Sequence, residues 1–238
     1  AYPVPMTVFP YPVPDWGWEI CETPWTVQSL WWHYLYTKDD ELLRAKIYPI
    51  LKVAAMFIED YLNNPYAKDK KRFNDGLFHV FPTVAPEIYG ITLDFYYNAD
   101  CIVDIALIQF LFNAVIESSQ ILNTDKDLRK RLETIMKKLP TYFCVTKNNK
   151  TVWTDIRNGS AQAIYNIPSP MAPVFPGEQV TLNSSPEMLA IANDTYDELI
   201  TEGGNDLVYN PLIEARLGRF DKEAFKQYVR YCLLPDGA

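Results

Sequence analysis

The loop from Val84 to Gly90 holds a carboxylate in surroundings that suit acid catalysis. Glu87 lies there among apolar and aromatic residues, with no Lys or Arg nearby in the sequence. Burial in such surroundings raises the pKa of a carboxyl group, so that it keeps its proton and can act as a general acid. We therefore predict that Glu87 is a catalytic residue. In the alternative, Glu87 points to water or accepts hydrogen bonds from N–H groups of its own loop.

Three aspartates, Asp94, Asp100 and Asp104, follow this loop closely. Asp100 and Asp104 have the i, i+4 spacing that places two side chains on one face of a helix. A second carboxylate facing Glu87 across a sugar would suit glycoside hydrolysis, which needs an acid and a base or nucleophile beside the bond. Asp100 could instead cap the helix. Asp104 interrupts an apolar run, so it is either buried with a partner or points into a cavity, and we predict that it binds substrate.

A second group of aromatic and acidic residues precedes the first predicted helix. The segment from Asp15 to Glu19 contains Trp16 and Trp18, and Glu22 and Trp25 follow it. Trp rings can stack on a sugar while neighbouring carboxylates bind its hydroxyl groups. We predict that Trp16, Trp18 and Glu22 bind substrate, and packing of the Trp rings in the core is the alternative.

Other chemistries lack the residues that they need. The two histidines, His33 and His79, and the four cysteines lie far apart, and no pair has the close spacing of a zinc site or a redox dithiol. The sequence contains no nucleophile elbow, no Gly-rich phosphate loop and no HExxH helix. We expect neither a metal ion nor a cofactor. The widely spaced thiols fit both a reduced core and two disulfides.

The composition is typical of a folded protein, and the net charge is negative. Of the 238 residues, 48% are hydrophobic and 22% are charged, whereas the aromatic share of 14% is high. The formal net charge of −8 repels nucleic acid. No apolar run comes near the roughly 20 residues of a membrane span. We therefore expect a soluble chain without nucleic-acid or membrane partners.

Hydrophobic periodicity predicts about seven helices, the first two of which form an antiparallel hairpin. The N-terminal stretch, Ala1 to Asp15, contains five prolines and is expected to be an extended connector. The predicted helices run from Thr23 to about Leu35, from Asp39 or Asp40 to Leu62, from Ile102 to Leu122, from Thr124 to Leu139, from Ser184 to about Ile200, from Asn205 to Leu217 and from Asp221 to Leu234. Thr124 to Asp127 has a capping-box pattern, and Ser184 to Glu187 is a strong signal for a helix N-terminus.

Two long segments, Asn63 to about Asp100 and Pro140 to Asn183, have no helical period. The first is too apolar for a solvated linker, so we expect it to be ordered. The second shows β-like alternation around Thr151 to Ile156. We predict a single all-α domain over residues 1–238, an (α/α) toroid whose loops on one side carry the function. The loops are too long and unequal for TPR-like repeats.

Several of these stretches resemble the catalytic domain of glycoside hydrolase family 95, the (α/α)6-barrel α-L-fucosidases and α-L-galactosidases. Trp31 to Asp39 is similar to the family's Trp-x-His-Tyr-x-x-Thr-Gly-Asp turn, and Pro82 to Glu87 is similar to its Pro-Ser-Thr-Ser-Pro-Glu-Asn loop. Ile102 to Phe112 resembles the Thr-Met-Asp helix behind that loop, and Phe175 to Gln179 resembles the Tyr-Pro-Gly-x-Gln segment. The resemblance implies an inverting exo-glycosidase that acts on the terminal sugars of glycans, with Glu87 as general acid and a secreted or periplasmic location.

The barrel of that family has twelve helices, which exceeds what this chain can hold. We therefore expect the chain to be the central part of such a barrel, cut from something longer. The resemblance implies that the paired Asn residues that position water lie before Ala1, and that the Asp they assist lies after Ala238. Ile88 replaces a family Asn, and Ser169 to Ala172 lacks the family's histidine. Two alternatives therefore remain, a non-catalytic carbohydrate-binding toroid and an α-helical protein-interaction scaffold.

Overall fold

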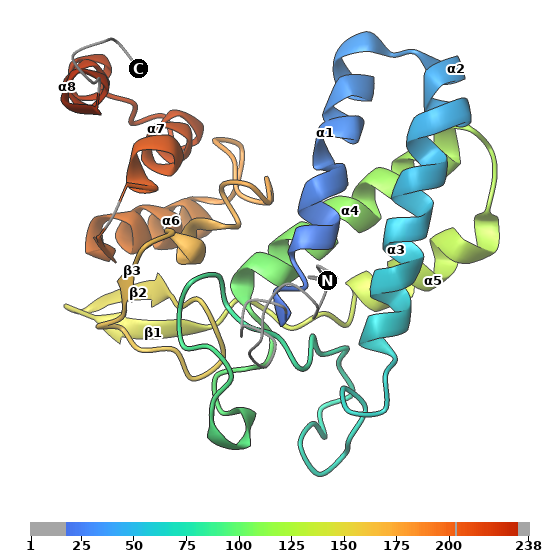
Figure 1. Cartoon of the computed structure of the whole chain (residues 1–238), viewed down its shortest axis with the longest axis horizontal. Coiled ribbons are helices and arrows are strands. Elements are labelled where there is room, and N and C mark those ends of the chain that lie inside the picture. Colours follow the sequence, from blue (N-terminus) through green and yellow to red (C-terminus); the bar gives the residue numbers. More distant parts are fainter. Residues whose placement is uncertain (1–17, 203, 233–238) are drawn as a thin grey trace, which may run out of the picture.

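The computed structural model describes residues 18–202 and 204–232, and one long central helix joins its two groups of elements (Figure 1). One group contains the helices α1, α3, α4 and α5, and the other contains the strands and the helices α6, α7 and α8. The long loop between α3 and α4 lies at the end of the molecule opposite α2, and the second loop, which starts after α5, runs from that end past the strands to α6. The predicted connector, Ala1 to Asp15, and Trp16 lie outside the described residues.

The first helices form the predicted antiparallel hairpin. Helix α1 (Glu22–Thr37) ends where Lys38 adopts the left-handed conformation with φ 54°. The Asp39 carboxylate then accepts a hydrogen bond from the Leu42 N–H at 2.9 Å and caps α2 (Asp40–Leu42). This confirms one of the two predicted capping residues. A π-helical turn (Leu43–Ile47) carries the chain into α3 (Tyr48–Leu62) without a break.

The central helix, α4 (Ile102–Ile121), matches its predicted range and is buried along most of its length. Its first two turns belong to one core cluster and its later turns belong to another. Among the described helices, α4 is the one that is long and apolar enough to cross a membrane, which corrects our expectation that no apolar run approaches that length. A core helix passes the same test, and 78% of the most apolar part of α4 is buried inside the fold.

Helix α5 (Lys126–Met136) returns beside α4 but begins differently from our prediction. Thr124 to Asp127 was expected to form a capping box. Instead, the Asp125 carboxylate accepts hydrogen bonds from the Tyr48 hydroxyl at 2.7 Å and from the Lys52 ammonium at 2.8 Å. These bonds lower the pKa of Asp125 and tie the start of α5 to α3. A tertiary contact therefore replaces the local cap.

The second group of elements surrounds a small hairpin. Strands β1 (Cys144–Lys147) and β2 (Lys150–Trp153) pair antiparallel with Val145 opposite Val152, close to the predicted alternation. Strands β3 (Ile164–Tyr165) and β4 (Ile200–Thr201) pair parallel. Helix α6 (Pro186–Glu198) packs on β2, and α7 (Asp206–Arg216) and α8 (Lys222–Cys232) follow it. The fold is mostly helical, which confirms the all-α class.

The second long loop is anchored directly on α4. Gln179 donates from its amide nitrogen to the Ala106 carbonyl of α4 at 2.9 Å. A Cβ atom added at Gly177 would lie 2.6 Å from the Ala172 carbonyl oxygen and 2.7 Å from the Cβ atom of Ala106. Only glycine allows the loop to approach the helix this closely. The segment that resembles the family's Pro-Gly-x-Gln sequence is therefore a packing contact.

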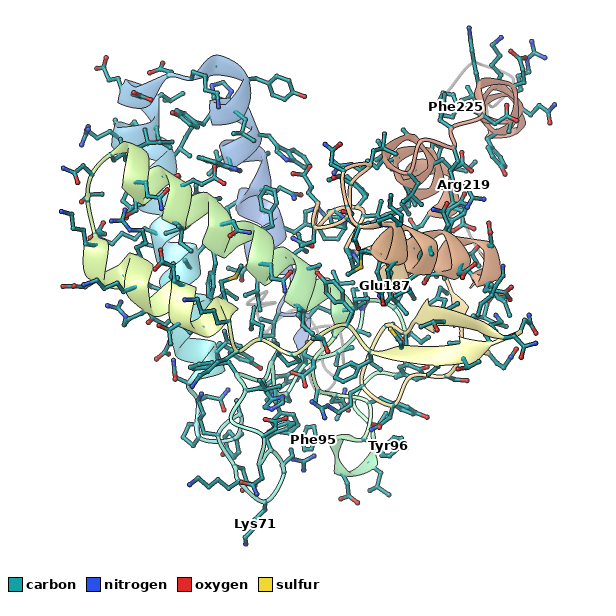
Figure 2. The ribbon with its side chains drawn as sticks, turned by 180° about the vertical axis from the view of Figure 1, so that it is seen from behind. Lys71, Phe95, Tyr96, Glu187, Arg219 and Phe225 are labelled. Atoms are coloured by element: carbon teal, nitrogen blue, oxygen red, sulfur yellow. The ribbon has the colours of Figure 1, made fainter. Side chains whose placement is uncertain are left out.

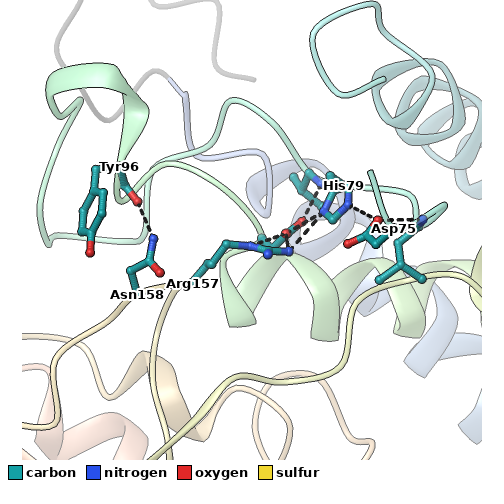
Figure 3. A network of polar contacts seen from close by, with 8 residues as sticks. Asp75, His79, Tyr96, Arg157 and Asn158 are labelled. Carbon is teal, nitrogen blue, oxygen red and sulfur yellow. Dashed lines mark hydrogen bonds and ion pairs between the residues drawn. The ribbon is translucent and has the colours of Figure 1, made fainter. Parts of the chain in front are cut away.

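A buried ion network joins the first long loop to the second (Figure 3). His79 and Asp100 are both fully buried, and their Nδ1 and Oδ2 atoms are 2.8 Å apart. The Asp100 carboxylate also contacts Arg157 at 2.8 Å and accepts from the Val80 N–H at 3.0 Å. Burial lowers the pKa of His79, but its hydrogen bonds to Asp100 and Asp75 outweigh burial and raise that pKa overall. The network holds both loops in one arrangement.

This network corrects the predicted role of Asp100. Helix α4 begins at Ile102, so Asp100 precedes the helix and does not share a helical face with Asp104. Asp100 has a φ of 59°, in the left-handed region, and this turns its carboxylate toward His79 instead of toward the helix N-terminus. The predicted pairing and the predicted cap are both wrong, because His79 and Arg157 compete for the carboxylate.

Replacing Asp100 by Asn is expected to lower the free energy of unfolding by about 3 to 5 kcal/mol, because the buried His79 and the part-buried Arg157 lose the carboxylate that they share. Urea denaturation of the wild type and the variant measures this difference. As a control, Lys226→Gln removes an exposed pair with Glu223 on α8 and is expected to leave stability nearly unchanged. Equal effects of the two substitutions would show that the network does not hold the loops.

Candidate active site

The two long loops run side by side in opposite directions. Besides the contact between Asp100 and Arg157, three hydrogen bonds join them, from Asn166 to the Glu87 carboxylate, from the Ser160 N–H to the Tyr89 hydroxyl at 3.5 Å, and from Asn158 to the Tyr96 carbonyl at 3.3 Å. Figure 3 shows the last of these contacts. The residue numbers of the bonded partners increase along the first loop, from 87 to 96, and decrease along the second, from 166 to 158. The loops therefore form a strip of surface with Glu87 at one end and Tyr96 at the other.

The turn that carries Glu87 is fixed by backbone hydrogen bonds. The Thr83 N–H donates to the Asn98 carbonyl at 2.9 Å, and the Val84 N–H donates to the Trp18 carbonyl at 3.1 Å. Ala85 is buried, whereas the Glu87 side chain is exposed and its φ is 56°. The enclosed apolar setting that the sequence suggests for Glu87 is not seen within the described part of the chain. Its carboxylate instead faces solvent and is oriented by Asn166.

Two further carboxylates belong to this region, since Glu19 contacts Glu87 and Glu22 contacts Glu19. Burial, followed by the charge of Glu22, raises the pKa of Glu19 to about 7. A hydrogen bond from the Glu87 N–H opposes this rise, and the charge of Glu87 adds to it. Glu22 lies in the first turn of α1, half-buried. Glu19 therefore lies between two other acidic residues and keeps its proton to a higher pH than an ordinary carboxyl group.

Glu19 is the residue that the sequence analysis missed. Glu19 is close to Glu22 in the sequence, but its other neighbour in the fold, Glu87, lies far along the chain. Hydrophobic periodicity indicates which residues share one face of a helix. It does not indicate which loops contact one another, so it could not pair Glu19 with Glu87.

Trp18 lies next to this cluster and contributes both its backbone and its ring. Its carbonyl accepts hydrogen bonds from the Val84 N–H at 3.1 Å and from the Thr83 hydroxyl at 3.3 Å. The residue is 41% exposed, so its ring is not packed in the core as the alternative required. An exposed indole ring beside carboxylates remains available for stacking. Trp16, its predicted companion, lies outside the described residues.

Asp104 supports the Glu87 turn from beneath. The residue is fully buried, and its Oδ2 atom accepts a hydrogen bond from the Thr83 hydroxyl at 2.6 Å. Its Oδ1 atom has no hydrogen-bond partner within the described part of the chain. Burial raises the pKa of Asp104 to about 7, against hydrogen bonds from Thr83 and the Cys21 backbone that lower it. Of the two possibilities the sequence left open, the structure shows a buried carboxylate with a partner.

The arrangement suits proton transfer to a neutral ligand rich in hydroxyl groups. An exposed carboxylate, held by an amide, lies beside a half-buried carboxyl group that titrates near pH 7. Clustered negative charge disfavours phosphates and other anions. Across residues 18–202 and 204–232, no group of three His, Cys, Asp or Glu side chains has the geometry to hold a metal ion.

Replacing Asp104 by Asn is expected to change how stability depends on pH. The fold raises the pKa of Asp104 from its ordinary value of 3.8 to about 7, so the wild type loses stability as the pH rises from about 4 to 7. The neutral amide does not titrate, so the stability difference between variant and wild type should change by about 2 to 4 kcal/mol over this range.

Urea denaturation at intervals of pH tests this expectation. Asp94→Asn, at an exposed position, is the matched control. Parallel stability curves for the wild type and Asp104→Asn would contradict the raised pKa.

Two comparisons with known proteins identify the family of this chain. The family model of the glycosyl hydrolase family 95 catalytic domain matches residues 5–232. Alpha-L-fucosidase 2 of Arabidopsis thaliana is 27% identical over 200 residues, which cover 81% of this chain and 22% of that protein. The chain therefore spans about a fifth of the length of this curated relative. The resemblance found in the sequence is confirmed, and the chain belongs to the family of glycosyl hydrolase family 95 catalytic domains.

Proposed function

We propose that this chain supplies the general acid of a glycoside hydrolase that removes terminal sugars from glycans. The observation that carries the proposal is the position of Glu87, exposed on a turn that backbone hydrogen bonds fix and oriented by the amide of Asn166. A family match over residues 5–232 favours catalysis over sugar binding alone and over a protein-interaction scaffold.

In the proposed mechanism, Glu87 donates a proton to the oxygen of the glycosidic bond as the bond breaks. Asn166 donates its hydrogen bond to Oε2 of Glu87, which leaves Oε1 to carry the proton to the leaving oxygen. A base outside the described residues activates water on the opposite face of the sugar, so the anomeric configuration inverts. Trp18 and Glu22 bind the sugar beside Glu87.

The curated relative supports an α-L-fucoside as the terminal sugar, because its name describes an alpha-L-fucosidase. The chain spans about a fifth of that relative, so the activity of the whole protein is part of the proposal. A hydrolase of external glycans would be secreted or periplasmic, and this location belongs to the same proposal.

An apolar groove on the helical hairpin supports the proposal that further barrel helices pack there. The groove has a volume of about 550 Å³ and lies between α1 and α3. Val53 of α3 is 67% exposed at its floor, and Ile50 is 48% exposed. Exposed apolar surface of this kind is commonly covered in the complete protein. Its lining residues are Thr23, Val27, Pro49, Ile50, Val53, Ala54 and Phe57.

Replacing Glu87 by Gln in the full-length gene product is expected to lower kcat on a fucosyl oligosaccharide about 100-fold or more, because the leaving oxygen loses its proton donor. The loss should be much smaller on a 2,4-dinitrophenyl glycoside, whose leaving group needs little protonation. Initial rates on both substrates measure the difference. Glu41→Gln, at an exposed position in α2, is the control. Unchanged turnover of the oligosaccharide by Glu87→Gln would remove Glu87 from the mechanism.

The inverting mechanism is tested by the configuration of the first product. Proton NMR during hydrolysis of an α-L-fucoside should show the β anomer of the free sugar before mutarotation, because water attacks from the opposite face. Early appearance of the α anomer would instead require a covalent intermediate. Saturable sugar binding without turnover by the wild type would favour the carbohydrate-binding alternative.

A further inference from the structure

Three tyrosine rings form a ladder that begins two residues after Glu87. The rings of Tyr89 and Tyr97 stack with 4.2 Å between centroids and 17° between planes. Tyr96 meets Tyr97 nearly edge-on, with 4.8 Å between centroids and 78° between planes. We call Tyr89, Tyr97 and Tyr96 the tyrosine ladder. It follows the strip of loop surface away from the proposed general acid.

The outer end of the tyrosine ladder is open to solvent. Tyr96 is 58% exposed, whereas Tyr89 and Tyr97 are half-buried. Leu93 and Phe95 beside it are also exposed, and Figure 2 shows Phe95 and Tyr96 on the loop side of the molecule, away from the helices. A contiguous patch of exposed apolar and aromatic residues of this kind commonly marks a binding surface.

The backbone around the tyrosine ladder is held in a conformation that side chains disfavour. Glu87, Tyr89, Asp94 and Phe95 all have positive φ angles, between 53° and 66°. Each such residue costs free energy, and clusters of them persist where the surrounding fold fixes a functional shape. The Ser160 N–H donates to the Tyr89 hydroxyl at 3.5 Å, which holds the first ring of the ladder against the second loop. The rings are therefore presented in one arrangement.

Polar side chains of the second loop border the tyrosine ladder. Asn158, Ser160 and Gln162 are exposed, and Asn158 also donates to the Tyr96 carbonyl at 3.3 Å. A pyranose ring has an apolar face of C–H groups and an edge of hydroxyl groups. Aromatic rings bind the face, and amides and hydroxyls bind the edge. The chemistry of this surface therefore fits a sugar better than an aliphatic or anionic ligand.

We propose that the tyrosine ladder binds the leaving-group sugar of an oligosaccharide substrate, the unit on the far side of the bond that is cleaved. The inference rests on the proposed function. A general acid protonates the oxygen that departs with the leaving group, so a surface that continues from Glu87 along the loops contacts that part of the substrate. The tyrosine ladder selects oligosaccharides over substrates without a leaving-group sugar.

The test compares two substrates with the same terminal sugar, a fucosyl oligosaccharide and α-L-fucosyl fluoride, in the full-length gene product. Tyr96→Ala should lower kcat/KM on the oligosaccharide about tenfold, a factor that corresponds to about 1.4 kcal/mol, and leave kcat/KM on the fluoride within about twofold. Tyr96→Trp keeps a stacking ring and should retain the activity on the oligosaccharide. Tyr36→Ala, 91% exposed at the end of α1, is the control.

Equal losses on both substrates would overturn the assignment of the tyrosine ladder. A large fall in melting temperature for Tyr96→Ala would also overturn it, because Tyr96 would then be covered by another part of the protein. If the wild type hydrolyses neither substrate, the proposed function fails separately. Calorimetric titration with the oligosaccharide then decides, since weaker binding by Tyr96→Ala supports the ladder as a sugar-binding surface and unchanged binding overturns it.

Discussion

The apolar surface of α4 must be covered on every side, and the rest of the structure depends on this constraint. A helix with one apolar face needs one neighbour, but α4 is buried around most of its circumference. Helices α1, α3 and α5 cover its later turns. Around its first turns the cover comes from irregular loops and from α6 and α7. Long loops next to the start of α4 are therefore ordered because they are part of the core.

Buried charge then fixes where those loops lie. Asp100 and His79 are fully buried, and each would be costly without its partner. Their pairing with Arg157 specifies a single register between the two loops, since a displaced loop would leave an unpaired charge inside the protein. Asp104 adds a second buried carboxylate under the Glu87 turn. These buried groups lower the stability of the fold, but they hold the turn in one shape without regular secondary structure.

Contacts within an element were predictable from the sequence, and contacts between loops were not. The helical period located α4, and Ser185 caps α6 through the Met188 N–H at 3.2 Å, as its neighbours suggested. The failures share one cause. The sequence predicts that Asp125 and Asp100 each cap a helix. In the fold, each carboxylate instead binds a cation or hydroxyl group from a distant part of the chain. Such partners are set by the path of the loops, which no periodicity encodes.

The carboxylates around Glu87 show how a site can retain a proton without enclosing the proposed acid. The sequence pointed to an apolar pocket, yet Glu87 is exposed. The proton is held instead by Glu19, whose pKa is raised to about 7 by its burial and, after that, by the charges of Glu22 and Glu87. Repulsion among neighbouring carboxylates favours protonation of one of them, as in paired catalytic carboxyl groups. Glu19 therefore keeps its proton to a higher pH than an ordinary carboxyl group, at the end of the strip where the glycosidic oxygen would lie.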